Sequence, residues 1–377
     1  MDVKEMLERE NLPLIMCQTM EHFFEDIYHC NVRLSTDRQN GSIPLYLMSR
    51  PGVMIGNGAT KDAYRTIFTE YTLRGSFVRF FAAQAFITLR LLMKKRNAAA
   101  VIYAKTDTPE KLHNMLIVPN NKSVRVFSYQ TGTVFSIVKS GFKRDFFRNQ
   151  VEFRKQYKYS FILPLRACGE DWFEEDILKG HSLARVRDER AYQESLDCAV
   201  QYISQLFQDT QYSIDRREYF QDLLNQIVHL LQILPEDPVQ IEKLRGLVAA
   251  IQRKEADFSG EIQVGYSHGD FQAGNIWRDE NGKTWIYDWE TVGIRSAWYD
   301  QAVMFGGLRR GKDYATFLRE ETSGWLNNNV GTTEKILIIL EDIVFQLREA
   351  VVLQSDAALK FISSMWNTKC SAFEESL

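Results

Sequence analysis

The amino-acid sequence predicts an α+β protein with two lobes, a small β-rich part followed by a larger helical part. Short, β-rich apolar runs separated by turn residues follow one another between residues 113 and 141. From about residue 188, apolar residues recur at three- and four-residue intervals, which is typical of amphipathic helices. The length of 377 residues also exceeds what one small core would fill.

We therefore predict three parts in order along the chain. Residues 1–108 form an N-terminal extension of mixed and helical structure. Residues 109–175 form the β-rich N-lobe, and residues 176–377 form the helical C-lobe. The net charge of −3 gives no general attraction to nucleic acid. The five scattered cysteines lack CxxC spacing and the N-terminus is too charged for a secretory signal, so we expect a cytoplasmic protein with reduced thiols.

Within the extension, the stretch RFFAAQAFITLRLLMKKR (79–96) is an apolar helix signal that ends in basic residues. It is too short to cross a bilayer. Two interpretations are open: a helix packed on the protein core, or a helix lying in the plane of a membrane surface with basic anchors. The second would make the protein peripheral to the inner face of the membrane.

The β-rich part predicts an antiparallel meander. The runs MLIVPNN, SVRVFSY and TVFSIVKSG are separated by turn residues and precede a helical segment, RDFFRNQVEFRKQY. A further strand, YSFILPLRAC, precedes WFEEDILKG (172–180), which we expect to connect the lobes.

The C-lobe contains a loop rich in chemically capable side chains. The stretch SHGDFQAGNIW places His268, Asp270 and Asn275 between two predicted strands. The following NIWRDENGKTWIYDW has two β-rich arms around Asn281-Gly282, which is a hairpin signal. Because a hairpin brings its ends together, Asn275 should lie near Asp288.

This arrangement suits phosphoryl transfer. An amide oxygen from Asn275 and a carboxylate from Asp288 would form a site for Mg²⁺, which shares its ligands with nucleotide phosphates. Asp270 would accept the proton of an attacking hydroxyl, while His268 would tie the loop to the backbone. The same order of residues occurs in the catalytic and metal motifs of protein kinases.

Three upstream positions complete the predicted nucleotide site. Lys139, at the end of a strand, would contact the α- and β-phosphates, and Glu152 would orient it. Lys122 would add charge to a glycine-free phosphate loop at 118–127. Adenine would hydrogen-bond to the connector backbone near Glu175 to Ile177.

HGDFQAGNIW together with IYDWE resembles the aminoglycoside phosphotransferase and choline kinase-like family, over about residues 113–310. The resemblance implies a bilobal, protein-kinase-like fold, ATP as donor, Mg²⁺, and a small-molecule hydroxyl as acceptor. It also implies that Asp300 braces the catalytic loop, and Glu290 belongs to the same structural support. Residues 1–108 lie outside the usual family pattern.

The acceptor is expected to be small. Only 11 residues separate Asp288 from Asp300, which leaves no room for a peptide-docking activation segment. A sugar or saccharide hydroxyl, as in cell-surface polysaccharide metabolism, is the first choice, and an aminoglycoside-type antibiotic or a choline-like alcohol comes next. Glu341, Asp342, Arg309 and Arg310 are candidates for the acceptor-site wall or for solvated helix faces. A nucleotide-binding pseudokinase scaffold at a membrane surface is the alternative of another class.

Overall fold

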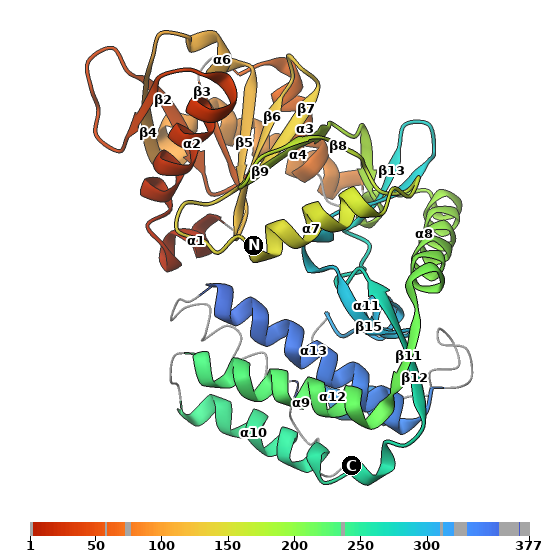
Figure 1. The fold of residues 1–377 in the computed structure, drawn as a ribbon. Helices are drawn as coiled ribbons and strands as arrows, with labels where there is room; N and C mark the ends of the chain where they lie inside the picture. The colour runs from red at the N-terminus through yellow and green to blue at the C-terminus, as the bar shows by residue number, and fades with distance from the viewer. Residues whose placement is uncertain are drawn as a thin grey trace. The chain divides into compact units, whose positions relative to one another are not determined.

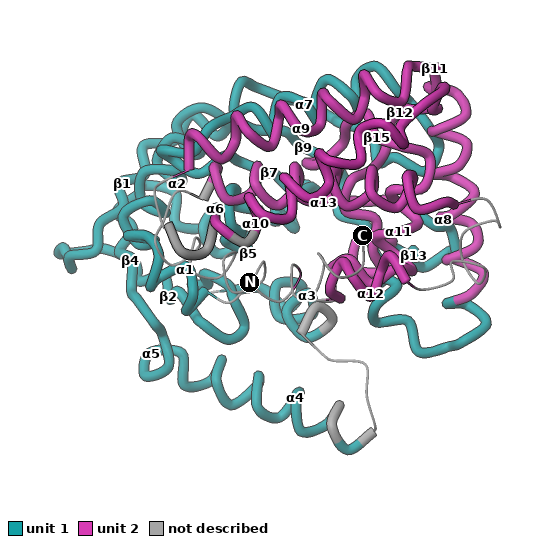
Figure 2. The backbone as a smooth tube through the Cα atoms, turned by 90° about the horizontal axis from the view of Figure 1, so that it is seen from below, with its two compact units in different colours: residues 1–192, 277–285 teal, residues 193–276, 286–377 magenta. Residues whose placement is uncertain are grey.

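The structure is a computed structural model that describes residues 3–56, 59–71, 77–234, 238–309, 312–319, 330–353 and 369. Figure 1 shows the ribbon, and Figure 2 shows its two compact units. Unit 1 comprises residues 1–192 and 277–285, and unit 2 comprises residues 193–276 and 286–377. The predicted mixture of α and β structure is confirmed.

Unit 1 is built on one nine-stranded antiparallel sheet with the order β1-β4-β2-β3-β5-β6-β7-β9-β8. Its strands are β1 (Val32–Ser35), β2 (Ile43–Met48), β3 (Val53–Gly56), β4 (Ala98–Thr106), β5 (Met115–Pro119), β6 (Ser123–Ser128), β7 (Thr133–Val138), β8 (Leu165–Cys168) and β9 (Trp172–Asp176). The strands predicted around 115–138 and 172–176 therefore form. β8, the edge strand next to β9, begins at Leu165, directly after Pro164.

Helices cover both faces of this sheet. They are α1 (Val3–Arg9), α2 (Leu12–Tyr28), α3 (Lys61–Tyr71), α4 (Phe77–Leu92), α5 (Lys94–Asn97), α6 (Pro109–His113) and α7 (Asp145–Gln156). Alternate residues of a strand point to opposite faces. Phe135 and Ile137 therefore pack with α1 and α2, whereas Val138 packs with α7 on the other face.

The structure differs from the predicted boundary at residue 108. Strands β1 to β4, from residues 1–108, belong to the same sheet as β5 to β9. The supposed extension is thus an integral part of the unit that carries the predicted N-lobe. The four strands were not predicted, because none shows a long alternation of apolar and polar residues.

Unit 2 is mainly helical. Its helices are α8 (Glu189–Thr210, beginning in unit 1), α9 (Arg216–Ile233), α10 (Pro238–Gln252), α11 (Tyr299–Met304), α12 (Tyr314–Arg319) and α13 (Thr332–Leu353). A small sheet joins β11 (Tyr212–Asp215), β12 (Glu261–Ser267) and β15 (Gly293–Ser296). Helix α9 begins at an N-cap, Asp215, whose carboxylate accepts the N–H groups of Arg217 and Glu218. Helices α9, α10 and α13 share one apolar core.

The predicted hairpin forms as β13 (Ile276–Asp279) and β14 (Thr284–Ile286), next to β10 (Gly180–Ser182). Its turn is closed by the N–H of Gly282, which donates to the carbonyl of Asp279. The final stretch, AFEESL, lies outside the described residues. No helix in the described ranges is long and apolar enough to cross a bilayer.

Candidate active site

The loop after β12 is held by one buried carboxylate, that of Asp300 in α11. Its two oxygens accept the N–H groups of His268, at 2.7 Å, and Gly269, at 2.9 Å. Gly269 has a φ of +86°, and a Cβ there would lie 2.4 Å from the carbonyl oxygen of Thr291. Only glycine fits this position without displacing the backbone. The contacts of Asp300 are those of a brace for the loop.

His268 is fully buried and ties the loop to the hairpin. Its Nε2 lies 2.8 Å from the carbonyl oxygen of Tyr287, and its Nδ1 accepts the N–H of Asp270 at 3.3 Å. These partners require the tautomer with the proton on Nε2. The imidazole therefore orients Asp270 through the backbone.

Asp270 is half-buried and its carboxylate is oriented by three side-chain donors. Oδ2 accepts from Gln272 Nε2 at 2.9 Å and from Asn275 Nδ2 at 3.1 Å. Oδ1 accepts from Arg309 Nε at 3.2 Å. An ionised carboxylate offers about two lone-pair positions on each oxygen, so Oδ1 keeps one for a further donor.

Arg309 supports the Asp270 carboxylate, a role that the sequence analysis did not predict for it. Besides Asp270 it donates to the carbonyl of Gly269, at 3.2 Å, and to the hydroxyl of Tyr299, at 2.9 Å. It also pairs with Asp342 of α13 and lies 3.8 Å above the ring of Phe345. Burial opposes its charge, but its neighbours, including Tyr299, Asp342 and Asp270, raise the pKa of Arg309 above its ordinary value.

Asp342 continues this network away from the loop. It accepts from Tyr314 Oη at 2.7 Å and from Lys369 Nζ at 2.6 Å. Burial acts to raise its pKa, but the charges of Lys369 and Arg309 outweigh it and hold the pKa of Asp342 at about 2.

None of Arg309, Glu341 and Asp342 lies on a solvated helix face: Glu341 and Asp342 are buried, Arg309 is half-buried, and all three are hydrogen-bonded. Glu341 accepts from Ser296 N, at 2.6 Å, and from Tyr219 Oη, at 2.5 Å. Arg310 lies outside the described residues. Sequence spacing gave no sign of this network, since its members come from three separate helical segments and a loop.

A backbone hydrogen bond at the base of the hairpin joins the segments that carry Asn275 and Asp288. The N–H of Tyr287 donates to the carbonyl of Asn275 at 2.8 Å, which places the next residue, Asp288, beside it. Asp288 has φ 64° and ψ 62°, a left-handed conformation that costs a non-glycine residue energy and is concentrated at functional sites. Glu290 follows in the short 3-10 helix η3 (Trp289–Thr291), where it is half-buried.

The predicted pair of Lys139 and Glu152 is wrong. Lys139 Nζ is buried and lies 2.6 Å from Glu10 Oε1, at the end of α1, and 3.2 Å from the carbonyl of Asn121. Glu152 is exposed on α7, which covers the opposite face of the sheet. Every second residue of a strand lies on the same face, so Lys139 shares the face of Phe135 and Ile137, which pack against α1 and α2. This alternation could have shown that Lys139 faces away from α7. Burial lowers the pKa of Lys139, partly offset by its bond and charge contact with Glu10.

The other predicted nucleotide contacts also have partners within the fold. Lys122 is buried with Nζ 5.0 Å from the ring centre of Phe146. Glu175 lies inside β9 and pairs with Arg154 of α7 at 2.6 Å. The N–H of Ile177 already donates to the carbonyl of Gly132 at 3.0 Å, so that donor is not free for adenine.

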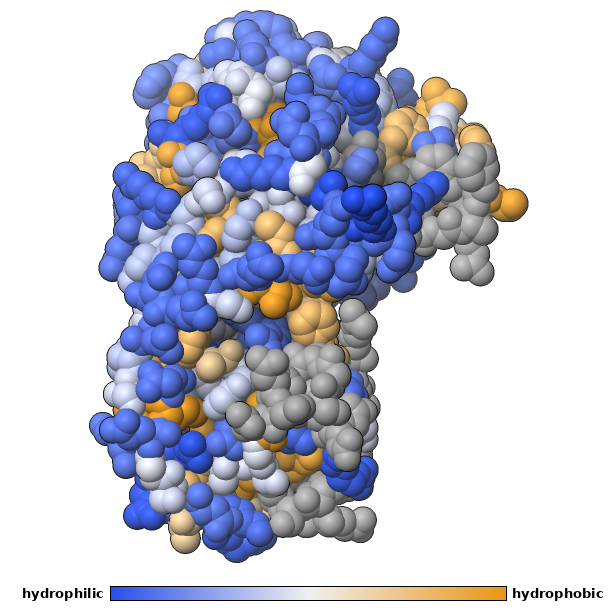
Figure 3. All heavy atoms as spheres, turned by 90° about the vertical axis from the view of Figure 1, so that its right-hand side faces the viewer, coloured by the Kyte–Doolittle hydropathy of each residue, from blue (hydrophilic) through white to orange (hydrophobic). Residues whose placement is uncertain are grey.

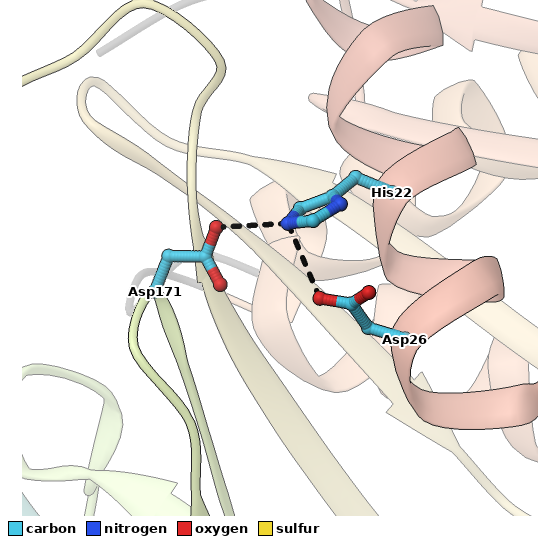
Figure 4. Close-up of side chains that lie close together, drawn as sticks. All are labelled: His22, Asp26 and Asp171. Atoms are coloured by element: carbon cyan, nitrogen blue, oxygen red, sulfur yellow. Dashed lines mark ion pairs between the residues drawn. The ribbon is translucent and has the colours of Figure 1, made fainter.

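A separate group of titratable side chains lies in unit 1 (Figure 4). His22 Nε2 is 3.2 Å from Asp26 Oδ2 and 3.3 Å from Asp171 Oδ2. Arg144 Nη2 lies 3.7 Å from the same oxygen of Asp171. The group therefore has the contacts of an ion-pair cluster that joins α2 to the segment before β9, and it contains none of the predicted metal ligands.

Comparisons with known proteins found a matching family model and proteins of similar fold. The family model described as "Phosphotransferase enzyme family" matches residues 173–328. No curated protein matches the chain. A thermostable mutant of the aminoglycoside phosphotransferase APH(4)-Ia, in a ternary complex with AMP-PNP and hygromycin B, has a similar fold with a TM-score of 0.51; at 14% identity, 70% of this chain and 93% of that one are covered.

Two further solved structures are more distant. The choline kinase LicA from Streptococcus pneumoniae has a TM-score of 0.44 and 13% identity, covering 69% of this chain and 90% of that one. An ethanolamine kinase from Plasmodium vivax has a TM-score of 0.44 and 10% identity, covering 84% and 97%. Residues 173–328 thus match the phosphotransferase enzyme family, so the predicted resemblance to phosphotransferases is confirmed, and the kinase-like fold is confirmed with it.

Proposed function

We propose that the protein uses Mg²⁺ and ATP to phosphorylate a hydroxyl of a small molecule, with Asp270 as the general base. The observation that carries the proposal is the orientation of the Asp270 carboxylate. Donors from Gln272 and Asn275 occupy Oδ2, while Oδ1 accepts from Arg309 and keeps a lone pair. Oδ1 is therefore the atom expected to receive the acceptor hydroxyl.

In the proposed reaction the acceptor oxygen attacks the γ-phosphorus of ATP. A new oxygen–phosphorus bond forms, the bond to the β-phosphate oxygen breaks, and ADP leaves. The hydroxyl proton passes to Asp270 Oδ1. Phosphoryl transfer depends mostly on positioning, so the fixed carboxylate orients the acceptor before it takes the proton.

Asn275 and Asp288 fit a Mg²⁺ site. The amide nitrogen of Asn275 faces Asp270, so its Oδ1 points the other way, and the backbone bond beside Tyr287 brings Asp288 next to it. An amide oxygen and a carboxylate are the hard donors that Mg²⁺ prefers. When bound, the ion would neutralise charge on the phosphates.

The phosphate contact needs a cation other than Lys139. On the α7 side of β6 and β7, the positions are Ser123, Arg125 and Phe127 on β6 and their partners on β7. Arg125, opposite Ser136, is the basic residue among them. We propose Arg125 for this role.

The nucleotide contact is tested by titrating ATP with Mg²⁺ in a thermal-shift assay. Arg125→Met should raise the apparent Kd about tenfold or more, since a charge-assisted bond to phosphate contributes about 1.5 to 3 kcal/mol. The exposed Arg217→Met on α9 is the matched control. An unchanged Kd in Arg125→Met would remove Arg125 from the site.

The acceptor is proposed to be a saccharide-type, aminoglycoside-type or choline-like alcohol. The short connection from Asp288 to Asp300, which holds η3 and β15, leaves no peptide-docking segment. The solved structure of similar fold is an aminoglycoside phosphotransferase in complex with AMP-PNP and hygromycin B. A nucleotide-consumption screen over these three classes would choose among them.

Asp270→Asn tests the base assignment, because asparagine keeps the shape but cannot take the proton. We expect turnover to fall by about 10² to 10⁴ while ATP binding is retained. Asp222→Asn, on an exposed position of α9, should leave turnover unchanged. Full turnover in Asp270→Asn would disprove the assignment.

A nucleotide-binding pseudokinase scaffold is the second candidate. The observation that favours it is the capture of Lys139 by Glu10, which removes a predicted phosphate contact. This candidate predicts ATP binding without turnover for any acceptor in the screen. We also propose that the protein works in the cytoplasm at the inner face of the membrane, and the free state of Cys17, Cys30, Cys168 and Cys198 is in keeping with a reducing compartment.

A further inference from the structure

Helix α4 of unit 1 is apolar on two sides. One side packs into the core through Ile87 and Leu91, which are 6% and 5% exposed. The other side carries large apolar side chains that face solvent: Val78 78%, Phe81 55%, Phe86 48%, Leu89 56%, Leu92 78% and, one residue past the helix, Met93 37% exposed. At 3.6 residues per turn these six positions fall within an arc of about 140°. We call them the α4 face.

The α4 face is unusual for this molecule. The other large apolar side chains that are exposed in the described part of the chain are Leu14, Tyr212, Val228, Ile233 and Ile294, scattered over four elements. The view in Figure 3 likewise shows a mostly hydrophilic surface with apolar atoms in a few patches. A contiguous exposed apolar stripe marks an interaction site rather than ordinary surface.

The charge around α4 indicates which surface it meets. No acidic residue occurs from residue 71 to residue 106, although the chain as a whole has a net charge of −3. The same stretch holds seven basic residues: Arg74, Arg79, Arg90, Lys94, Lys95, Arg96 and Lys105. Lys95 and Arg96, directly after Leu92 and Met93, are exposed. An apolar helix face beside exposed cations has the properties of a helix that lies in an anionic membrane interface.

We infer that the α4 face inserts into the headgroup and acyl boundary of a membrane that contains anionic lipids, with Lys95 and Arg96 at the phosphates. A second copy of the chain is a poorer occupant, because pairing two α4 faces would bring two sets of cations together without a carboxylate in the segment. The inference rests on the proposed location at the inner face of the membrane and specifies the surface that binds there. It is independent of the proposed phosphoryl transfer, because the residues proposed for that reaction lie outside α4.

The test is co-sedimentation of the full chain with vesicles of phosphatidylcholine alone or mixed with phosphatidylglycerol. We expect binding to the anionic vesicles, falling more than tenfold between about 0.05 and 0.5 M salt. Leu89→Glu should abolish binding, and Lys95→Glu with Arg96→Glu should weaken it at least about tenfold. Val228→Glu on α9, 49% exposed in the wild type, is the matched control and should bind as the wild type does.

The opposing outcomes are distinct. Failure to sediment with anionic vesicles at low salt would overturn the inference, and so would equal, salt-independent binding to both vesicle types. A dimer in sedimentation velocity that Leu89→Glu dissolves, without vesicle binding, would assign the face to a second copy instead. Failure of the kinase chemistry would appear in nucleotide consumption and leave vesicle binding unchanged. The turnover of Leu89→Glu on a soluble acceptor should equal that of the wild type.

Discussion

Arg309 contacts the carboxylate of Asp270 from outside the loop. It contacts the carboxylate and the carbonyl of Gly269, and Asp342 fixes it from behind. We expect Arg309→Met to lower kcat about a hundredfold with little change in the KM for ATP, since a small misplacement of a reacting group costs that much.

In an Asp270→Asn background, Arg309→Met should lower kcat only a little further, because both changes disrupt the same positioning of the residue 270 side chain. Arg309→Lys should restore only part of the loss, as an ammonium cannot reproduce the planar set of donors. Arg217→Met serves as the exposed control. Additive losses in the double variant would show that Arg309 acts elsewhere, for example on the stability of unit 2.

Asp342 gives unit 2 a specific dependence on pH. Its pKa in the folded protein, about 2, lies below the ordinary value of 3.8, so the carboxylate stabilises the fold above about pH 4. This contribution, on the order of 2 kcal/mol, should disappear as the pH falls from about 4 to 2.

Urea unfolding at several pH values would measure it. The difference in unfolding free energy between the wild type and Asp342→Asn should shrink over that pH window, whereas the exposed Asp222→Asn should differ little at any pH. A constant difference down to pH 2 would contradict the prediction.

The sequence identified the residues of the catalytic loop and hairpin because they lie within 21 positions and one hairpin joins them. Their interpretation as base and metal ligands stays a prediction. Lys139 was assigned the wrong partner, because its position at the end of a strand does not by itself tell which face of the sheet its side chain lies on. Arg309 was placed on a surface, because the pairing of buried charges between distant helices leaves no trace in spacing.

At the scale of elements, the buried pair of Glu10 and Lys139 joins α1 to the end of β7. Glu10→Gln would leave the Lys139 ammonium buried without a counter-charge, and we expect the free energy of unfolding to fall by about 3 to 5 kcal/mol. Replacing both residues with methionine should recover most of the loss.

The exposed pair of Lys4 and Glu8 on the same helix is the internal control. Glu8→Gln should change stability by less than about 1 kcal/mol. Urea denaturation followed by circular dichroism would measure all three variants against the wild type. A loss as small in Glu10→Gln as in Glu8→Gln would mean that water reaches Lys139.

Elements with strong periodicity were predicted well. Strand β6 alternates, β5 and β7 are short β-rich apolar runs, and α13 repeats apolar residues every three or four positions, so local sequence was sufficient. β1, β2 and β4 escaped prediction because pairing within a large sheet stabilises them more than their own pattern does.

At the scale of the whole molecule, the family resemblance begins only near residue 113. Residues 1–108 were therefore predicted to be an N-terminal extension. The structure shows instead that four of their strands and two of their helices complete the sheet and cover one of its faces. The predicted boundary at residue 108 therefore marks where the family resemblance begins. The structural unit begins earlier, because its sheet already includes strands β1 to β4.

Lys369 extends the support of the reaction centre to a residue far away in the sequence. It reaches the carboxylate that steadies Arg309, which in turn touches the proposed base. Lys369→Met would thus loosen the reaction centre from behind. Such a variant would mimic a mutation beside the substrate, although Lys369 reaches Asp270 only through Asp342 and Arg309.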